Sequence, residues 1–178
     1  MESIREGYSK ETIEGFYKSR KDVYKNPHQG YIIKLLSELN FDPQVSYLDL
    51  ACGPGLVTRH LQDIGAKDII GCDPYFKDIY ERNTCLECLP YSFEDISRGY
   101  LSYLKVNTVV CSYAMHLLKA SYLNTFLYEL TNISNYMIII SPNNKPSVDY
   151  FWRKIYINRF GKSRLTIYKK GNPKVPFF

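Results

Sequence analysis

Hydrophobic residues along this chain follow two patterns, one typical of helices and one typical of buried strands. A helix is predicted where apolar residues recur three and four positions apart, at Ile32, Leu35, Leu36 and Leu39. From residue 45 onward, short apolar runs alternate with helical stretches. Strands are predicted at Val45–Ala51, Asp68–Asp73, Leu86–Leu89, Val106–Ser112 and Tyr136–Ser141, and helices near Gly55–Ile64, Phe76–Arg82, Glu94–Tyr103 and Ala120–Ile133.

This alternation is typical of a parallel sheet that helices cover on both faces. The predicted fold class is therefore α/β, with three α/β/α layers and a central, mostly parallel sheet. After Pro142 the pattern fits two structures. Residues Asp149–Asn158 form either a helix or the start of a strand that pairs with Arg164–Lys169 across a turn at 160–162. The second structure adds an antiparallel C-terminal strand, which we favour.

The first forty residues predict two helices. Residues Ser9–Tyr24 place apolar side chains at helical spacing, and Asn26-Pro27 separates them from the next helix. The first helix suits either a lid or a packed outer layer. Because the 178 residues contain no repeat and no linker, we expect a single domain over 1–178, with N-terminal helices at 1–40, a core at 45–141 and a C-terminal segment at 142–178.

The composition, 45% hydrophobic and 23% charged, is that of a soluble globular protein. No stretch approaches the roughly 20 apolar residues that cross a bilayer, and the first ten residues lack the apolar core of a secretory signal. We therefore expect a cytoplasmic protein with no membrane partner. The chain has five cysteines, Cys52, Cys72, Cys85, Cys88 and Cys111. Because their number is odd, we predict reduced thiols. The spacing of Cys85 and Cys88 suits zinc, but no second pair accompanies it, so no metal is predicted.

Charge is unevenly distributed. The chain has 23 basic and 18 acidic residues, a net charge of +5. From Phe151 to the end there are basic residues and no acid: Arg153, Lys154, Arg159, Lys162, Arg164, Lys169, Lys170 and Lys174. This basic segment is either a solvated surface or a region that attracts a phosphate-bearing substrate.

The segment "YLDLACGPGLVTRHL" ends a predicted strand in a glycine loop. Gly53 and Gly55 lack a Cβ, so a ligand can approach the main chain there. Asp73 ends the next strand, twenty positions after Gly53, where an acid can accept hydrogen bonds from a ribose. The pair predicts a site for a nucleoside-containing cofactor. A dinucleotide site is disfavoured because Thr58 stands where its third glycine is needed.

Four segments in order resemble the class I S-adenosylmethionine-dependent methyltransferases: "YLDLACGPG", "IIGCDP", "LPYSFEDI" and "VNTVVCSYAMHLL". The resemblance implies S-adenosyl-L-methionine as cofactor and a cofactor-binding core at 45–141. It places Asp73 on the ribose, Ser92 beside the adenine amino group and the Phe93 amide on the adenine. The cofactor-binding residues it implies are Asp49, Ala51, Cys52, Gly53, Gly55, Asp73, Pro74, Ser92, Phe93 and Ser112. Ala51 replaces the family's commoner first glycine, and Asn107 an acid that often begins the fourth segment.

The implied reaction is direct displacement of the cofactor's methyl group by an acceptor, without a covalent intermediate. His116 is the candidate general base or substrate contact, or else a packed histidine. The acceptor is a small molecule or RNA, since "NRFGKSRLTIYKK" is similar to part of the RNA cap guanine-N7 methyltransferases. The alternative is an inactive member of the fold that serves as a binding partner or activator.

Overall fold

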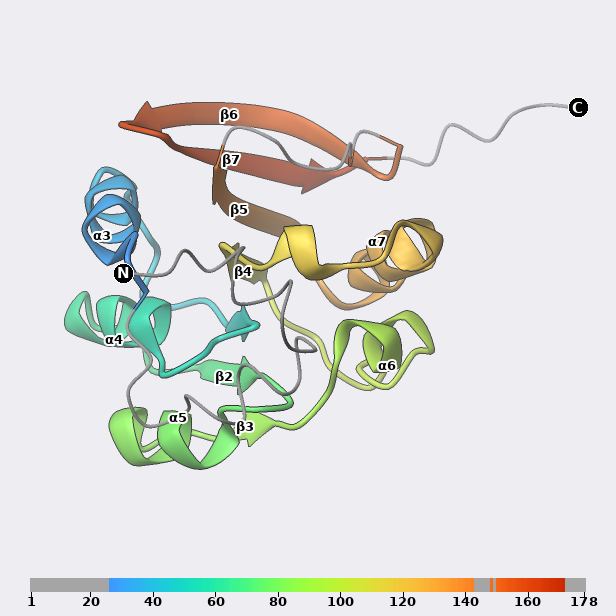
Figure 1. The fold of residues 1–178 in the computed structure, drawn as a ribbon, viewed down its shortest axis with the longest axis horizontal. Helices are drawn as coiled ribbons and strands as arrows, with labels where there is room; N and C mark the ends of the chain where they lie inside the picture. The colour runs from blue at the N-terminus through green and yellow to red at the C-terminus, as the bar shows by residue number, and fades with distance from the viewer. Residues whose placement is uncertain (1–25, 143–147, 149, 172–178) are drawn as a thin grey trace, which may run out of the picture.

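The computed structural model describes residues 26–142, 148 and 150–171, which form one mixed sheet flanked by helices (Figure 1). The sheet has seven strands in the order β3-β2-β1-β4-β5-β7-β6. They are β1 (Tyr47–Leu50), β2 (Ile69–Cys72), β3 (Cys88–Leu89), β4 (Thr108–Ser112), β5 (Tyr136–Pro142), β6 (Trp152–Phe160) and β7 (Ser163–Lys170). The first five strands are parallel, and β7 runs antiparallel to both β5 and β6.

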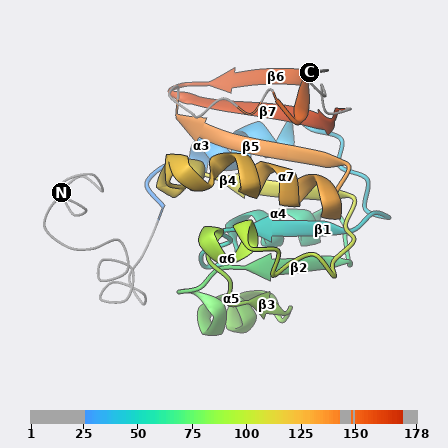
Figure 2. The same cartoon turned by 90° about the vertical axis from the view of Figure 1, so that its right-hand side faces the viewer.

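Helices cover both faces of the sheet, which confirms the predicted three-layer α/β class (Figures 1 and 2). On one face lie α3 (Gln29–Ser37), α4 (Leu56–Asp63) and α5 (Lys77–Thr84). On the other lie α6 (Phe93–Ser97) and α7 (Leu123–Ile133), with the short 3₁₀ turns η1 (Met115–Leu117) and η2 (Ala120–Tyr122) leading into α7. Among the described residues, no helix reaches the length and apolar character needed to cross a bilayer.

Side chains of the central strands alternate between two cores. Leu48 and Leu50 join the core under α6 and α7, while Tyr47 joins the core under α3 and α4. Since successive strand residues point to opposite faces, Asp49 points to the same side as Tyr47, toward α4. This register explains how a fully buried strand accommodates an acid, as described below.

One predicted helix ends earlier than expected, and the C-terminal segment takes the strand alternative that the sequence favours. The helix expected to reach Tyr103 ends at Ser97. Gly99 follows with a φ of +86°, and the amide of Tyr100 donates to the carbonyl of Asp95, a glycine-terminated helix end. The segment after Pro142 takes the strand alternative: β6 and β7 form a hairpin with Gly161 in its turn at a φ of +57°. The helix predicted at Ser9–Tyr24 lies outside the described residues.

Gly71 in β2 is expected to be intolerant of substitution. A Cβ at this position would lie 2.5 Å from Cζ of Tyr80, whose ring is fully buried and has no room to shift. Overpacking of this kind costs about 1–3 kcal/mol, and each kcal/mol lowers the melting temperature by roughly 2–4 °C in a domain of this size. Thermal unfolding of Gly71→Ala, followed by circular dichroism, measures the effect.

Gly30 offers a matched control. It lies in α3, and a Cβ there would meet no atom within 4 Å. Gly30→Ala should therefore leave the melting temperature unchanged or raise it, because alanine favours the helix. In a Tyr80→Leu background the cost of Gly71→Ala should shrink, since the ring that it meets is gone. Equal costs in both backgrounds would contradict the proposed clash.

Candidate cofactor site

A cavity of about 860 Å³ opens at the carboxyl ends of β1, β2 and β4. Strand order reverses here, because β1 lies between β2 on one side and β4 on the other. Open α/β sheets bind their ligands at such a reversal. The cavity brings together eight of the predicted cofactor-binding residues: Ala51, Cys52, Gly53, Asp73, Pro74, Ser92, Phe93 and Ser112.

The loop after β1 exposes its main chain to this cavity. Ala51 is held in the left-handed region, at a φ of +54°, by hydrogen bonds from the amides of Ala51 and Cys52 to the Cys72 carbonyl. That conformation is strained for alanine, so replacing the family's glycine here costs more than the added methyl. Gly53 has a φ of +51°, and a Cβ would meet open space. A ligand can therefore lie directly against this loop.

Gly55, also predicted as a cofactor-binding residue, is not among the residues that line the cavity. It stands at the N-cap of α4 with a φ of +88°, and a Cβ would lie 2.5 Å from Cγ2 of Thr84. The absence of a side chain allows α4 and α5 to pack closely. The two glycines of the loop thus have different functions, one open to a ligand and one required for packing.

Asp49 also lies outside the cavity lining. Its carboxylate accepts hydrogen bonds from the Thr58 amide at 3.1 Å and the Thr58 hydroxyl at 2.7 Å, and that hydroxyl lies 2.9 Å from the Tyr80 hydroxyl. Because Gly55 has no side chain to cap α4, the acid in β1 satisfies the helix amide instead. Burial raises the pKa of Asp49 to about 7, against the opposing effect of the two hydrogen bonds. Asp49 therefore supports the start of α4, next to the glycine loop, from outside the cavity.

Asp73 is the acid that reaches the cavity. Its Oδ2 accepts a hydrogen bond from the Gly53 amide at 3.1 Å, and its Oδ1 accepts from the amides of Tyr75 and Phe76 at 2.8 and 3.1 Å. The side chain is thus fixed between the end of β2 and the glycine loop, with 7% of its surface exposed. A carboxylate has about four acceptor positions, and these three main-chain amides orient Asp73 toward the cavity that it lines.

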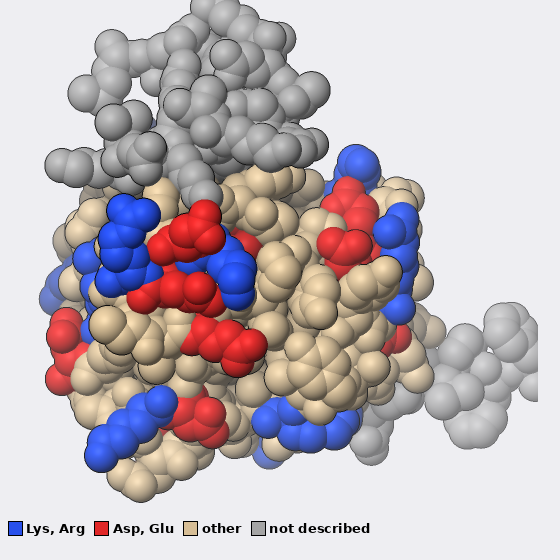
Figure 3. Space-filling model, turned by 90° about the horizontal axis from the view of Figure 1, so that it is seen from below, with Lys and Arg blue, Asp and Glu red and all other residues tan. Residues whose placement is uncertain are grey.

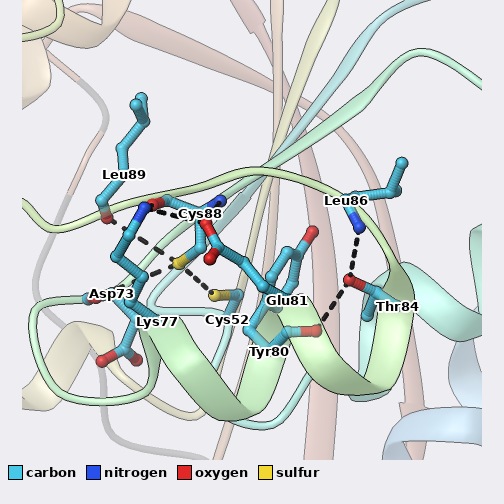
Figure 4. A network of polar contacts seen from close by, with 9 residues as sticks. All are labelled: Cys52, Asp73, Lys77, Tyr80, Glu81, Thr84, Leu86, Cys88 and Leu89. Carbon is cyan, nitrogen blue, oxygen red and sulfur yellow. Dashed lines mark hydrogen bonds and ion pairs between the residues drawn. The ribbon is translucent and has the colours of Figure 1, made fainter.

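Cys52 connects the glycine loop to β3 (Figure 4). Its Sγ lies 3.6 Å from Sγ of Cys88, and burial raises the pKa of Cys52 well above its usual value, so the thiol stays protonated at neutral pH. On the other side, Lys77 donates to the Cys88 carbonyl and to Glu81, each at 2.8 Å. Cys85 is exposed while Cys88 is buried, and no three metal-ligating side chains converge anywhere in the described part of the chain.

Ser92 and Phe93 reach the cavity at the start of α6. The Ser92 hydroxyl accepts from the Asp95 amide, and the Asp95 carboxylate accepts from the Ser92 amide, which is a capping box. The Ser92 hydroxyl also donates to the Asp95 carboxylate at 2.6 Å, and this bond and the one from the Ser92 amide lower the pKa of Asp95. The Phe93 amide stands in the first turn, where helix amides have no intrahelical acceptor. The Ser-x-x-Asp spacing that forms this cap at the start of α6 is visible in the sequence.

The catalytic candidate His116 does not line the cavity. In η1 it is exposed, while Met115 points into the core and Leu117 lines the cavity. The structure instead adds residues that the sequence analysis did not predict. Tyr113 borders the cavity after β4, and Lys119 forms an ion pair with Glu94 at 3.1 Å beside it. Glu94 directly follows Ser92 and Phe93, which were predicted as site residues. Nothing in the sequence indicates Lys119, because its ion pair with Glu94 joins two residues that are far apart along the chain.

The chain matches no protein-family model and no curated protein, but its fold matches solved structures. A SAM-dependent methyltransferase from Aquifex aeolicus superposes with a TM-score of 0.65 at 17% identity, over 85% of this chain and 97% of that one. Magnesium protoporphyrin IX methyltransferase from Synechocystis PCC 6803 with bound SAM gives 0.60 at 16% identity, over 92% and 94%. Ribosomal protein L11 methylase from Lactobacillus delbrueckii subsp. bulgaricus gives 0.59 at 14% identity, over 84% and 81%. The chain has the class I methyltransferase fold.

The four segments that resemble the methyltransferases in sequence lie around the cavity of this fold. The four segments that carry the resemblance lie at β1 and its loop, at β2, before α6, and at β4, and each contributes residues to the cavity. One line of evidence rests on short motifs and the other on the arrangement of the backbone. The suspected family is therefore confirmed at the level of fold.

Proposed function

We propose that this chain is an S-adenosyl-L-methionine-dependent methyltransferase that transfers a methyl group by direct displacement to an acceptor. The observation that carries the proposal is the pairing of Asp73 with the main chain of Gly53 at one wall of the cavity. A fixed carboxylate beside an open loop, at the ends of β1 and β2, suits the hydroxyls of a ribose. The fold shared with solved methyltransferases supports the same function.

The cavity suits this cofactor in size and in its polar groups. Its volume of about 860 Å³ lies in the range of small-molecule sites, and the space at Gly53 is open where a side chain would fill it. We assign Asp73 to the ribose, Ser92 and the Phe93 amide to the adenine, and Ser112 to the wall where methyl transfer occurs. When bound, S-adenosyl-L-methionine supplies an electrophilic methyl group on a sulfonium.

The chain contributes alignment and exclusion of water. Direct displacement requires the acceptor atom to lie in line with the bond that breaks, and such positioning accounts for about 7–11 kcal/mol of barrier in favourable cases. Leu117 and Phe93 provide apolar walls, and the loop after β4 lines the same cavity as Asp73. No covalent bond to the protein is needed, so no nucleophilic side chain is assigned.

The acceptor is either a small molecule or RNA. The solved relatives act, by their names, on a magnesium porphyrin in one case and on a ribosomal protein in another, so the fold accommodates unlike acceptors. The basic segment after Phe151 supports RNA, because it carries no acid that would repel a phosphate backbone. The RNA alternative is developed in the next subsection.

A second candidate function is an inactive binding partner or activator. It is favoured by the exposed position of His116, which leaves the predicted general base outside the cavity. It is opposed by Asp73 and the Gly53 loop, which a protein without cofactor has no need to retain. Both candidates place the same residues around the cavity, so only binding and transfer measurements separate them.

Calorimetric titration with S-adenosyl-L-methionine, followed by incubation with radiolabelled cofactor and fractionated RNA, protein and metabolite pools, tests the proposal. Binding together with label in one pool supports a methyltransferase and identifies its acceptor class. Binding without label in any pool would favour the partner role. The absence of binding to the purified chain would overturn both the cofactor assignment and the activity.

We also propose a cytoplasmic location. All five cysteines are free thiols, and Cys52, Cys72, Cys88 and Cys111 are buried. Proteins of oxidising compartments commonly use their cysteines in disulfides, whereas cytoplasmic proteins keep them reduced. Burial raises the pKa of Cys111 to about 12, which makes this thiol a weak nucleophile.

A further inference from the structure

Four aromatic rings form a row from the cavity to the turn between β6 and β7. Tyr113 lines the cavity, and the His28 ring stacks on it with centroids 4.5 Å apart and planes at 17°. His28 is 6.3 Å from Tyr31, and Tyr31 is 5.9 Å from Phe160 at the end of β6. Figure 1 shows why distant segments meet, since the β6–β7 turn lies over α3. The row joins three parts of the chain that the sequence separates.

The rings are held in place by the backbone around them. Tyr113 adopts a φ of +55°, which is strained for a residue with a side chain, and its hydroxyl bonds to the Ser163 hydroxyl at the start of β7. At the turn, a Cβ on Gly161 would lie 2.8 Å from Cε1 of Tyr31, so the glycine permits the ring to rest on the turn. Tyr31 and Phe160 nevertheless remain 38% and 42% exposed. Their positions are fixed while their surfaces stay accessible.

The hairpin at the outer end of the row carries only positive charge. Between Trp152 and Lys170 there are seven basic residues and no acid: Arg153, Lys154, Arg159, Lys162, Arg164, Lys169 and Lys170. Lys162 lies in the turn next to Phe160, and Arg159 lies on the opposite face of the same strand end. Glu38 of the segment after α3 contacts the hairpin at Asn158 and is also paired with Lys34. At the other end of the sheet, both signs lie side by side (Figure 3).

We propose that this row and the hairpin bind a single-stranded nucleic acid whose target base enters the cavity beside Tyr113. Accessible rings in sequence provide stacking surfaces for successive bases, and exposed cations neutralise the phosphates. Duplex is excluded as the ligand because its bases are already stacked on one another. The inference rests on the proposed methyltransferase function only for the identity of the acceptor, since binding itself requires no cofactor.

Fluorescence anisotropy of a labelled single-stranded 15-mer RNA, titrated with the full chain over a range of salt concentrations, tests this surface. Tyr31→Leu and Phe160→Leu should each weaken binding about fivefold or more at fixed salt, because one stacking surface is lost. Lys162→Gln should reduce the slope of log K against log salt by about 0.7. Matched controls are Tyr103→Leu and Lys67→Gln, which change exposed residues outside the row and the hairpin.

Each outcome separates this inference from the proposed function, provided that cofactor binding is titrated on the same preparations and thermal unfolding verifies each variant. RNA that does not bind, or that binds the row variants as tightly as the controls, overturns the nucleic-acid surface even where the cofactor binds. Equal affinity for a blunt RNA duplex overturns it too. RNA binding that depends on Tyr31 and Phe160, in a chain that binds no cofactor, supports this surface and overturns the methyltransferase proposal.

Discussion

Asp73→Ala is expected to weaken binding of S-adenosyl-L-methionine by about 100-fold or more. A hydrogen bond from a ribose hydroxyl to a charged group contributes about 1.5–3 kcal/mol, and each 1.4 kcal/mol is a factor of ten in affinity. The substitution also removes the acceptor of the Gly53 amide, so the loop loses its tie to β2. Calorimetric titration of the wild type and the variant measures the change.

Two further variants make this result interpretable. Asp63→Ala removes an exposed acid from α4 and should leave the affinity unchanged. Asp73→Asn keeps the size of the side chain but replaces one acceptor oxygen by a donor that faces main-chain amides, so it should weaken binding nearly as much as alanine does. If Asp73→Ala folds normally and retains the wild-type affinity, the ribose assignment is wrong.

Asp49 is expected to make stability depend on pH in a direction opposite to that of most carboxylates. Burial raises its folded pKa to about 7, from an ordinary value of 3.8. The folded chain therefore holds this proton more tightly than the unfolded chain does. The resulting stabilisation is fully present below the unfolded pKa and is lost as pH rises through about 7. At 1.36 kcal/mol for each unit of pKa, the loss is about 4 kcal/mol.

The comparison with Asp49→Asn isolates this effect from every other titration. Asparagine keeps an acceptor for the Thr58 amide but does not ionise, so its stability relative to wild type should rise between about pH 4 and pH 7 and level off above. Urea unfolding at several pH values measures the difference. Asp68→Asn, at an exposed acid, should show no such trend. A difference that is flat or falls over this interval would contradict a raised pKa for Asp49.

The layered fold could be predicted because it follows from local patterns. Alternating apolar runs and helical stretches specify a parallel sheet, since each strand must be buried on both faces by the helices beside it. The helix cap at the start of α6 also follows from a local pattern, the spacing of Ser92 and Asp95. Short-range geometry was sufficient for these features.

The roles of Asp49 and Gly55 could not be predicted in the same way. Both belong to a motif that resembles a cofactor loop, yet one caps α4 and the other makes room for Thr84 of α5. Which face of β1 a residue occupies is a matter of register against neighbouring strands. The side of η1 that His116 occupies likewise depends on Met115 entering the core.

Local sequence patterns predict a layered α/β domain with an acid and a glycine loop at successive strand ends, because these features depend on neighbours within a few residues. Which of those side chains share one cavity follows from the packed fold alone, and so does the row of Tyr113, His28, Tyr31 and Phe160. Contacts between residues far apart in sequence depend on strand order, register and the packing of helices on the sheet, and no local pattern encodes them.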